Sequence, residues 1–91
     1  MQYKNEKMLH LIKTFGECVR KKRIETTNKS LTLFSYEYDL DSGNMSRIEN
    51  GHIEPKLTML WRIAEALGIK LSDLCKMLEN SLGDDFFLID K

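Results

Sequence analysis

The chain has 91 residues, 42% of them hydrophobic, and its 14 lysines and arginines are balanced by 14 aspartates and glutamates. This length allows one domain with one small core, and it leaves little room for an enzymatic cleft. Zero net charge is unusual for a nucleic-acid binder, but the charge is unevenly distributed. Residues 1–56 hold ten basic and eight acidic residues, whereas residues 57–91 hold four basic and six acidic residues.

The sequence also lacks the features of membrane proteins and metalloproteins. No apolar run is long enough to span a membrane, and residues 4–7 lack the apolar core of a signal peptide, so we expect a cytoplasmic protein. Cys18 and Cys75 do not form a Cys-x-x-Cys motif; they are either two buried thiols or a redox-sensing pair that joins the first and last helices. His10 and His52 are single histidines. We expect no metal, no cofactor and no catalytic activity, since no nucleophile and base or carboxylate pair can be assembled.

A long first helix is predicted by apolar residues that recur at helical spacing, namely Met8, Leu11, Ile12, Phe15 and Val19. It extends from about residue 5 to about residue 26. A basic run at residues 20–23 lies near its end, where positive charge also suits the helix dipole. This run is either a solvated helix face or a surface that attracts phosphate.

A second, short helix is predicted from Leu31 to Tyr38. Ser30 can cap it, and Phe34 and Tyr38, four residues apart, are expected to be buried on one side. Asp39 follows where the chain must turn, and aspartate tolerates the left-handed backbone conformation better than most residues. A sharp turn is therefore expected directly after this helix.

The third predicted helix has clear start and end signals. Asp41 can cap it by accepting from unpaired backbone amides, and Gly51 suits the position after its end. Met45 and Ile48 point to one side and can anchor the helix in the core. The opposite side is polar and comprises Ser42, Gly43, Asn44, Ser46 and Arg47. Two short helices joined by a turn, over about residues 30–51, predict a helix-turn-helix, whose second helix can enter the DNA major groove.

Two further helices are predicted after a loop at residues 52–55. Pro55 suits the first turn of the fourth helix, which ends at Gly68. Its apolar stripe is expected to lie in the core and consists of Leu57, Leu60, Trp61, Ala64 and Leu67. The last helix follows Lys70 and contains the apolar residues Leu71, Leu74, Cys75 and Leu78.

A short tail at residues 83–91 follows the last predicted helix. It contains four consecutive apolar residues, Phe86–Ile89, which should be covered by something. The tail packs against the chain's own first or last helix, makes a dimer contact, or is disordered.

Most of the chain follows the pattern of a known group of regulators. The matching positions are Phe15, Gly16, Val19, Arg20, Arg23, Phe34, Ser35, Tyr38, Leu40, the run Met45–Gly51, Pro55, Lys56, Leu57 and the run Ile63–Ile69. On these residues the sequence resembles the Cro/CI-type family of helix-turn-helix regulators, also called the XRE family. It departs from the family pattern at Leu31, where the family usually has glutamine, and at Asp39, where the family usually has glycine.

The resemblance implies an all-α fold, a compact five-helix lambda-repressor-like DNA-binding domain at residues 1–82 with an extended first helix and the short tail at 83–91. It implies that helix 42–50 enters the major groove of double-stranded DNA. The positions that would face base edges are Ser42, Gly43, Asn44 and Arg47. The positions that would face the DNA backbone are Ser30, Leu31, Asn50, His52 and Lys56. The resemblance also implies a structural ion pair between Arg23 and Glu49.

We interpret the protein as a homodimeric, sequence-specific DNA-binding regulator of transcription, specifically a repressor that recognises a palindromic operator. The alternative is a protein-interaction module, such as an antitoxin or adaptor, that keeps the fold while binding mainly a protein partner. Zero net charge, Leu31, Gly43 and the apolar tail favour this alternative.

Overall fold

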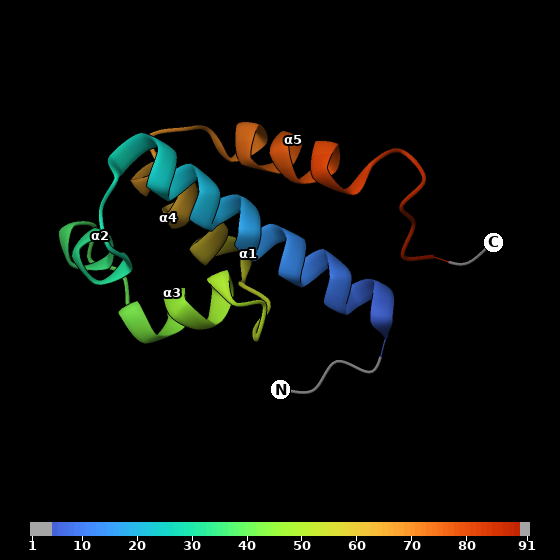
Figure 1. Ribbon diagram of the computed structural model, residues 1–91, viewed down its shortest axis with the longest axis horizontal. Coiled ribbons are helices and arrows are strands. Elements are labelled where there is room, and N and C mark those ends of the chain that lie inside the picture. Colours follow the sequence, from blue (N-terminus) through green and yellow to red (C-terminus); the bar gives the residue numbers. More distant parts are fainter. Residues whose placement is uncertain (1–4, 90–91) are drawn as a thin grey trace.

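The structure, a computed structural model, describes residues 5–89, and over this range the chain forms five α-helices and no strand. The helices are α1 (Glu6–Thr27), α2 (Leu31–Glu37), α3 (Ser42–Glu49), α4 (Leu57–Ala66) and α5 (Leu71–Leu82). Figure 1 shows α1 running through the middle of the molecule, with α3 on one side of it and α5 on the other. The prediction of a five-helix, all-α fold is confirmed. None of the helices within residues 5–89 is long and apolar enough to cross a membrane.

Helix α1 is the longest helix, and its start, buried side and end follow from local sequence. The Asn5 side chain accepts a hydrogen bond from the backbone N–H of Lys7 at 2.8 Å, which caps the first turn. The side that faces the core carries Ile12, Phe15 and Val19 at helical spacing. The helix ends at Thr27, and the next residue, Asn28, has a φ of 53°, the left-handed conformation common after helix ends.

Helix α2 and the turn after it agree with the prediction except at Tyr38. Ser30 Oγ accepts from the N–H of Leu33 at 3.1 Å, and Phe34 is fully buried. Tyr38, however, is exposed, so its predicted burial is wrong: the helix ends at Glu37, and Tyr38 is the capping residue at the edge of the core. Its ring still contacts Phe34, with the ring centroids 5.2 Å apart. Asp39 has a φ of 55°, as predicted for the turn.

Gly16 sets how closely α1 and α3 approach each other. A Cβ added at Gly16 would lie 2.3 Å from the backbone oxygen of Ile48 and 2.7 Å from that of Glu49. No side chain fits at that distance, so the backbone of α1 rests directly on the last turn of α3. The buried side of α3, formed by Met45 and Ile48, fills the core beside this contact. The predicted anchoring of α3 is therefore confirmed.

The apolar stripe of α4 was expected to be buried, and this expectation is wrong for two of its residues. Leu57 is 68% exposed and Trp61 is 58% exposed, whereas Ile63, Ala64 and Leu67 are buried. The apolar arc of α4 is wider than the neighbouring helices can cover, and Leu57 and Trp61 lie together at its edge, four residues apart. Pro55 also lies outside α4, because the helix begins at Leu57 after Lys56.

The two cysteines are in different environments, so the expectation of two buried thiols is wrong for Cys75. Cys18 is buried in α1, and its Sγ lies 3.5 Å from Ser81 Oγ of α5. Cys75 is exposed on α5. Both are free thiols, and no disulfide joins α1 to α5.

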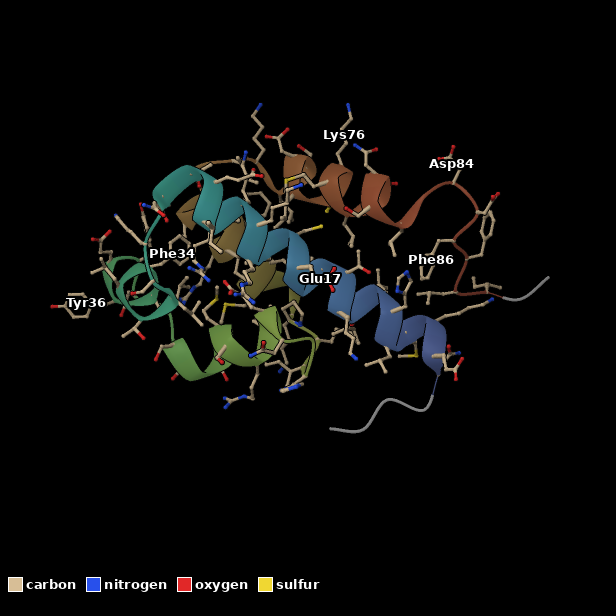
Figure 2. All side chains as sticks on the ribbon, in the orientation of Figure 1. Glu17, Phe34, Tyr36, Lys76, Asp84 and Phe86 are labelled. Atoms are coloured by element: carbon tan, nitrogen blue, oxygen red, sulfur yellow. The ribbon has the colours of Figure 1, made fainter. Side chains whose placement is uncertain are left out.

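In the tail, Phe86 packs on α1. The Phe86 ring lies 5.9 Å from the His10 ring of α1 and is partly buried, and Figure 2 shows it pointing back toward this helix. The next three residues, Phe87, Leu88 and Ile89, are exposed. The expected packing on the first helix is thus confirmed for Phe86, and a dimer contact of the tail stays a prediction.

Candidate nucleic-acid interface

Helix α3 presents a polar side to solvent while its other side is fixed in the core. Asp41 Oδ1 accepts from the N–H of Asn44 at 2.8 Å, so the predicted cap is present. Ser42, Gly43 and Arg47 are exposed, and Asn44 is partly buried. Because the buried residues on α3 are different ones, the exposed side chains can meet a partner without disturbing the core.

Asn44 and Arg47 contact each other one turn apart on this exposed side. Arg47 Nη2 donates to Asn44 Oδ1 at 2.5 Å, which draws the guanidinium back toward the start of the helix. Gly43 leaves the space for this arrangement: a Cβ there would lie 3.2 Å from Asp41 Oδ1 and 3.6 Å from Arg47 Nη1. The missing side chain at position 43 therefore leaves room for the Asp41 cap, with the Arg47 guanidinium close beside it. The i, i+3 spacing of Asn44 and Arg47 was the sequence signal for this contact.

A buried ion pair holds the end of α3 against α1. Arg23 Nε donates to Glu49 Oε2 at 2.8 Å and Nη2 donates to Oε1 at 2.9 Å, so the pair is bidentate. Arg23 Nη1 donates to the backbone oxygen of Lys29 at 2.6 Å, and both charged side chains are buried. The hydrogen bonds that Arg23 donates to Glu49 raise the pKa of Arg23, whereas its burial lowers that pKa. The guanidinium is therefore charged, and it connects α1 to α3 and to the loop before α2.

The five residues expected to face the DNA backbone lie at two places around α3. Ser30 and Leu31 are at the start of α2; Ser30 is exposed, while Leu31 is partly buried against the core. Asn50, His52 and Lys56 lie between α3 and α4 and are exposed. The His52 N–H donates to the oxygen of Arg47 at 2.8 Å, which holds this loop against the end of α3.

Comparison with known proteins identifies the group to which the chain belongs. A family model described as helix-turn-helix matches residues 46–74. The chain is 40% identical over 65 residues to the control protein C.MunI from a Mycoplasma species, and the match covers 71% of this chain and 88% of that protein. The chain belongs to the Cro/CI-type (XRE) family of helix-turn-helix regulators. The chain also superposes on the crystal structure of the clp gene regulator ClgR from C. glutamicum with a TM-score of 0.71 and 22% sequence identity. The superposition covers 80% of this chain and 92% of the ClgR chain, so the two proteins share a fold.

As a Cro/CI-type regulator, the protein is a DNA-binding regulator of transcription, and its family is one of regulators rather than enzymes. Among the described residues, no three His, Cys, Asp or Glu side chains are grouped as they would be around a metal ion.

One cation beside the regulator's α3–α4 loop was missed by the sequence reasoning. Lys13 of α1 is exposed, and its Cγ would lie 2.5 Å from a Cβ added at Gly51. It therefore contacts Gly51, which follows the end of α3 and precedes His52. Nothing in the local sequence could have placed Lys13 there, because the contact arises only when α1 packs across the end of α3.

Proposed function

We propose that this regulator binds a palindromic DNA operator as a homodimer and represses transcription, with α3 in the major groove of each half-site. The observation that carries the proposal is the division of α3: its buried side and the Arg23–Glu49 pair fix the helix, while its capped polar side is exposed. An α-helix fits the major groove of B-DNA, and residues near its N-terminus meet base edges there. We expect the protein to act in the cytoplasm.

Direct base readout would rest mainly on Asn44 and Arg47. Arginine pairs with guanine through two donors, and asparagine pairs with adenine through a donor and an acceptor. In the unbound protein Asn44 Oδ1 already accepts a hydrogen bond from Arg47. Pairing with adenine would therefore require the Arg47 guanidinium to leave Asn44, and it could then reach a neighbouring base. Ser42 can donate or accept, and Gly43 offers only its backbone, so we expect few base contacts in each half-site.

Contacts to phosphates would come from residues around α3. The proposed set consists of Ser30, Leu31, Asn50, His52 and Lys56, and we add Lys13 to it because Lys13 lies against Gly51, next to His52. Leu31 has no side-chain donor, so only its backbone N–H can contribute. If Lys13 and Lys56 each neutralise one phosphate per protomer, a dimer makes four such contacts, and log K should fall with log salt with a slope of about −4.

The experiment is selection of bound duplexes from a random DNA pool, followed by titration of the winner and of a scrambled duplex at two salt concentrations. A palindromic winner that binds much more tightly than the scrambled duplex supports the proposal. No enriched sequence, together with weak binding that disappears as salt rises, would overturn it and favour a protein-interaction module.

Arg47→Ala tests whether Arg47 contacts a base. We expect a loss of about 1–3 kcal/mol and relaxed preference at one guanine. The matched control is Lys76→Ala, because Lys76 projects from α5 on the side away from α3 (Figure 2) and its removal changes the net charge equally. Equal weakening on every sequence would assign Arg47 to a phosphate instead.

A further inference from the structure

The Arg47 guanidinium lies near the N-terminal end of α3, one turn before the residue that carries it. Its Nη1 and Nη2 atoms are 3.6 and 3.8 Å from a Cβ added at Gly43, four residues earlier. Long side chains on helices point back toward the N-terminus in this way. The positive charge therefore lies beside the first turn of α3, the part of a recognition helix whose side chains meet base edges.

Asn44 holds the guanidinium in this place. Arg47 Nη2 donates to Asn44 Oδ1 at 2.5 Å, and a hydrogen bond from a charged donor is stronger than one between neutral groups. The Asn44 backbone is itself fixed, because its N–H donates to Asp41 Oδ1 at 2.8 Å. The Asp41 carboxylate also favours a cation here, since it offsets the positive end of the helix dipole.

Asn44 is less well placed than Arg47 to reach a base itself. Met45 and Ile48 define the buried side of α3, and the helical repeat places Arg47 opposite this side and Asn44 at its flank. Arg47 is exposed, whereas Asn44 is partly buried. Asn44 also borders a hollow of about 260 Å³ whose lining includes Ile48 and Ile53. Arg47 therefore occupies the outward position, and Asn44 supports it from the side.

The two side chains can contribute to base recognition in two ways. If they read separately, the guanidinium leaves Asn44, which then pairs with adenine while Arg47 pairs with guanine. If they stay together, Arg47 pairs with guanine through its other donors, since a guanidinium carries five N–H groups. The second arrangement keeps the hydrogen bond of the unbound protein and avoids the entropic cost of ordering a long side chain on binding.

We propose that Asn44 is a positioning residue for Arg47: it holds the guanidinium at the outer side of α3, and the pair recognises one guanine in each half-site. This inference rests on the proposed function, because it requires α3 to enter the major groove, and it names the residue through which Arg47 gains its specificity. The operator should contain a guanine whose recognition depends on both side chains. It should contain no adenine whose recognition depends on Asn44 alone.

The first test measures base preference with the full chain. Wild-type protein, Asn44→Ala and Arg47→Ala are titrated against the selected operator and against each single base-pair change in its half-sites. Arg47→Ala should lower the preference for one guanine about 5- to 150-fold per half-site. Asn44→Ala should lower the preference for that same guanine about 2- to 12-fold, because Arg47 must then be ordered on binding. Loss of preference at an adenine, with the guanine preference unchanged, would overturn the proposal.

The double variant Asn44→Ala with Arg47→Ala tests whether the two side chains act as a unit. If Asn44 acts through Arg47, its removal has no further effect on base preference once Arg47 is gone, so the double variant should match Arg47→Ala. Ser42→Ala is the control, because Ser42 is an exposed residue of the same turn and its effect should be the same with Arg47 present or absent. Equal losses for Asn44→Ala with and without Arg47 would show independent reading.

Asn44→Asp keeps an acceptor for Arg47 and removes the amide donor that adenine N7 requires. The guanine preference should therefore be retained, while the added negative charge weakens binding to every duplex. An independent reader behaves differently, because an aspartate there would favour cytosine in place of adenine. A change of preference at such a second base pair would contradict the positioning role.

The last test uses the protein without DNA. Nuclear relaxation of the arginine Nε–H groups reports how ordered each guanidinium is on the picosecond-to-nanosecond timescale. Arg23 is the ordered reference, because its ion pair with Glu49 is buried, and Arg20 is the exposed reference. Arg47 should be more ordered than Arg20 in the wild-type protein and should lose this order in Asn44→Ala, with Arg23 unchanged. An Arg47 that moves as freely as Arg20 in the wild-type protein would overturn the proposal.

The DNA-free and DNA-bound measurements together separate this inference from the function on which it rests. A duplex selection that enriches no sequence would overturn the proposed function and the positioning role together. An enriched operator with separate guanine and adenine positions would overturn the positioning role alone.

Discussion

Glu49→Gln keeps the size of the Glu49 side chain but removes its negative charge from the pair that ties α1 to α3. Arg23 would then keep its charge in a buried site. The carboxylate that now accepts two charge-assisted hydrogen bonds from Arg23, at 2.8 and 2.9 Å, would be replaced by a neutral amide. Removing one partner of a buried ion pair typically costs about 3–5 kcal/mol. A chain of 91 residues is expected to have a total stability of about 5–14 kcal/mol, so the loss is a large part of it.

Thermal and urea unfolding followed by far-UV circular dichroism would measure this loss. At about 4–8 °C per kcal/mol for a domain of this size, the Tm should fall by at least about 12 °C. The matched control is Glu37→Gln, which removes the same charge from the Lys29–Glu37 pair on the surface. That pair is in solvent, so its loss should change the Tm little. A Tm for Glu49→Gln that is close to that of Glu37→Gln would refute the reasoning.

A double replacement, Arg23→Met with Glu49→Leu, separates the cost of an unpaired charge from the value of the pair. Because it leaves no buried charge, the double variant should be more stable than Glu49→Gln alone.

The pH dependence of the stability that the Arg23–Glu49 pair contributes has a definite sign. Glu49 holds the pKa of Arg23 above its ordinary value, so this contribution to stability is fully present below the unfolded-state pKa and is lost only as the pH rises through the raised, folded-state pKa. The arginine should therefore add no pH dependence near neutrality.

Two further predictions concern α1 and the start of α3. Gly16→Ala should lower the free energy of unfolding by about 1–3 kcal/mol, because the added Cβ would lie 2.3 Å from the Ile48 backbone oxygen. This loss should appear although alanine is the better helix former by about 1 kcal/mol. In the same urea unfolding experiment the control, Glu17→Ala at the neighbouring exposed position, should not destabilise the protein. Asp41→Asn should keep the hydrogen bond to the Asn44 N–H while removing a negative charge near DNA, so we expect tighter but less discriminating binding in titrations at two salt concentrations. Unchanged affinity would show that the Asp41 carboxylate is remote from DNA.

Local signals predicted the helix-turn-helix well. Ser30 and Asp41 are caps, Asp39 adopts a positive φ, and Gly51 follows the end of α3 with a φ of 72°. Each of these depends on hydrogen bonds or backbone preferences within a few residues, which a sequence displays directly. The exposed side of α3 was predictable for the same reason, since Met45 and Ile48 define its buried side.

Contacts between distant segments were not predictable. Periodicity showed that α4 is apolar on one side, but it could not show that the neighbouring helices leave Leu57 and Trp61 uncovered. Burial of the Cys75 thiol was expected because cysteine behaves as a small apolar residue, but Cys75 lies on the side of α5 that no other helix covers. The contact of Lys13 with Gly51 depends on the angle at which α1 crosses α3, and that angle is set by the whole core.

The separation of the two sides of α3 has a consequence for how the protein could change its target. Substitutions at Ser42, Ser46 or Arg47 alter what the helix offers to a duplex without removing a core side chain, so new operator preferences are accessible at little cost in stability. Gly43 is the exception, because a Cβ there would lie only 3.2 Å from Asp41 Oδ1, the oxygen that caps the helix. If α3 enters the major groove as proposed, operator preference in this scaffold should therefore diverge most easily at the outer positions of α3, while changes at position 43 must also accommodate the Asp41 cap.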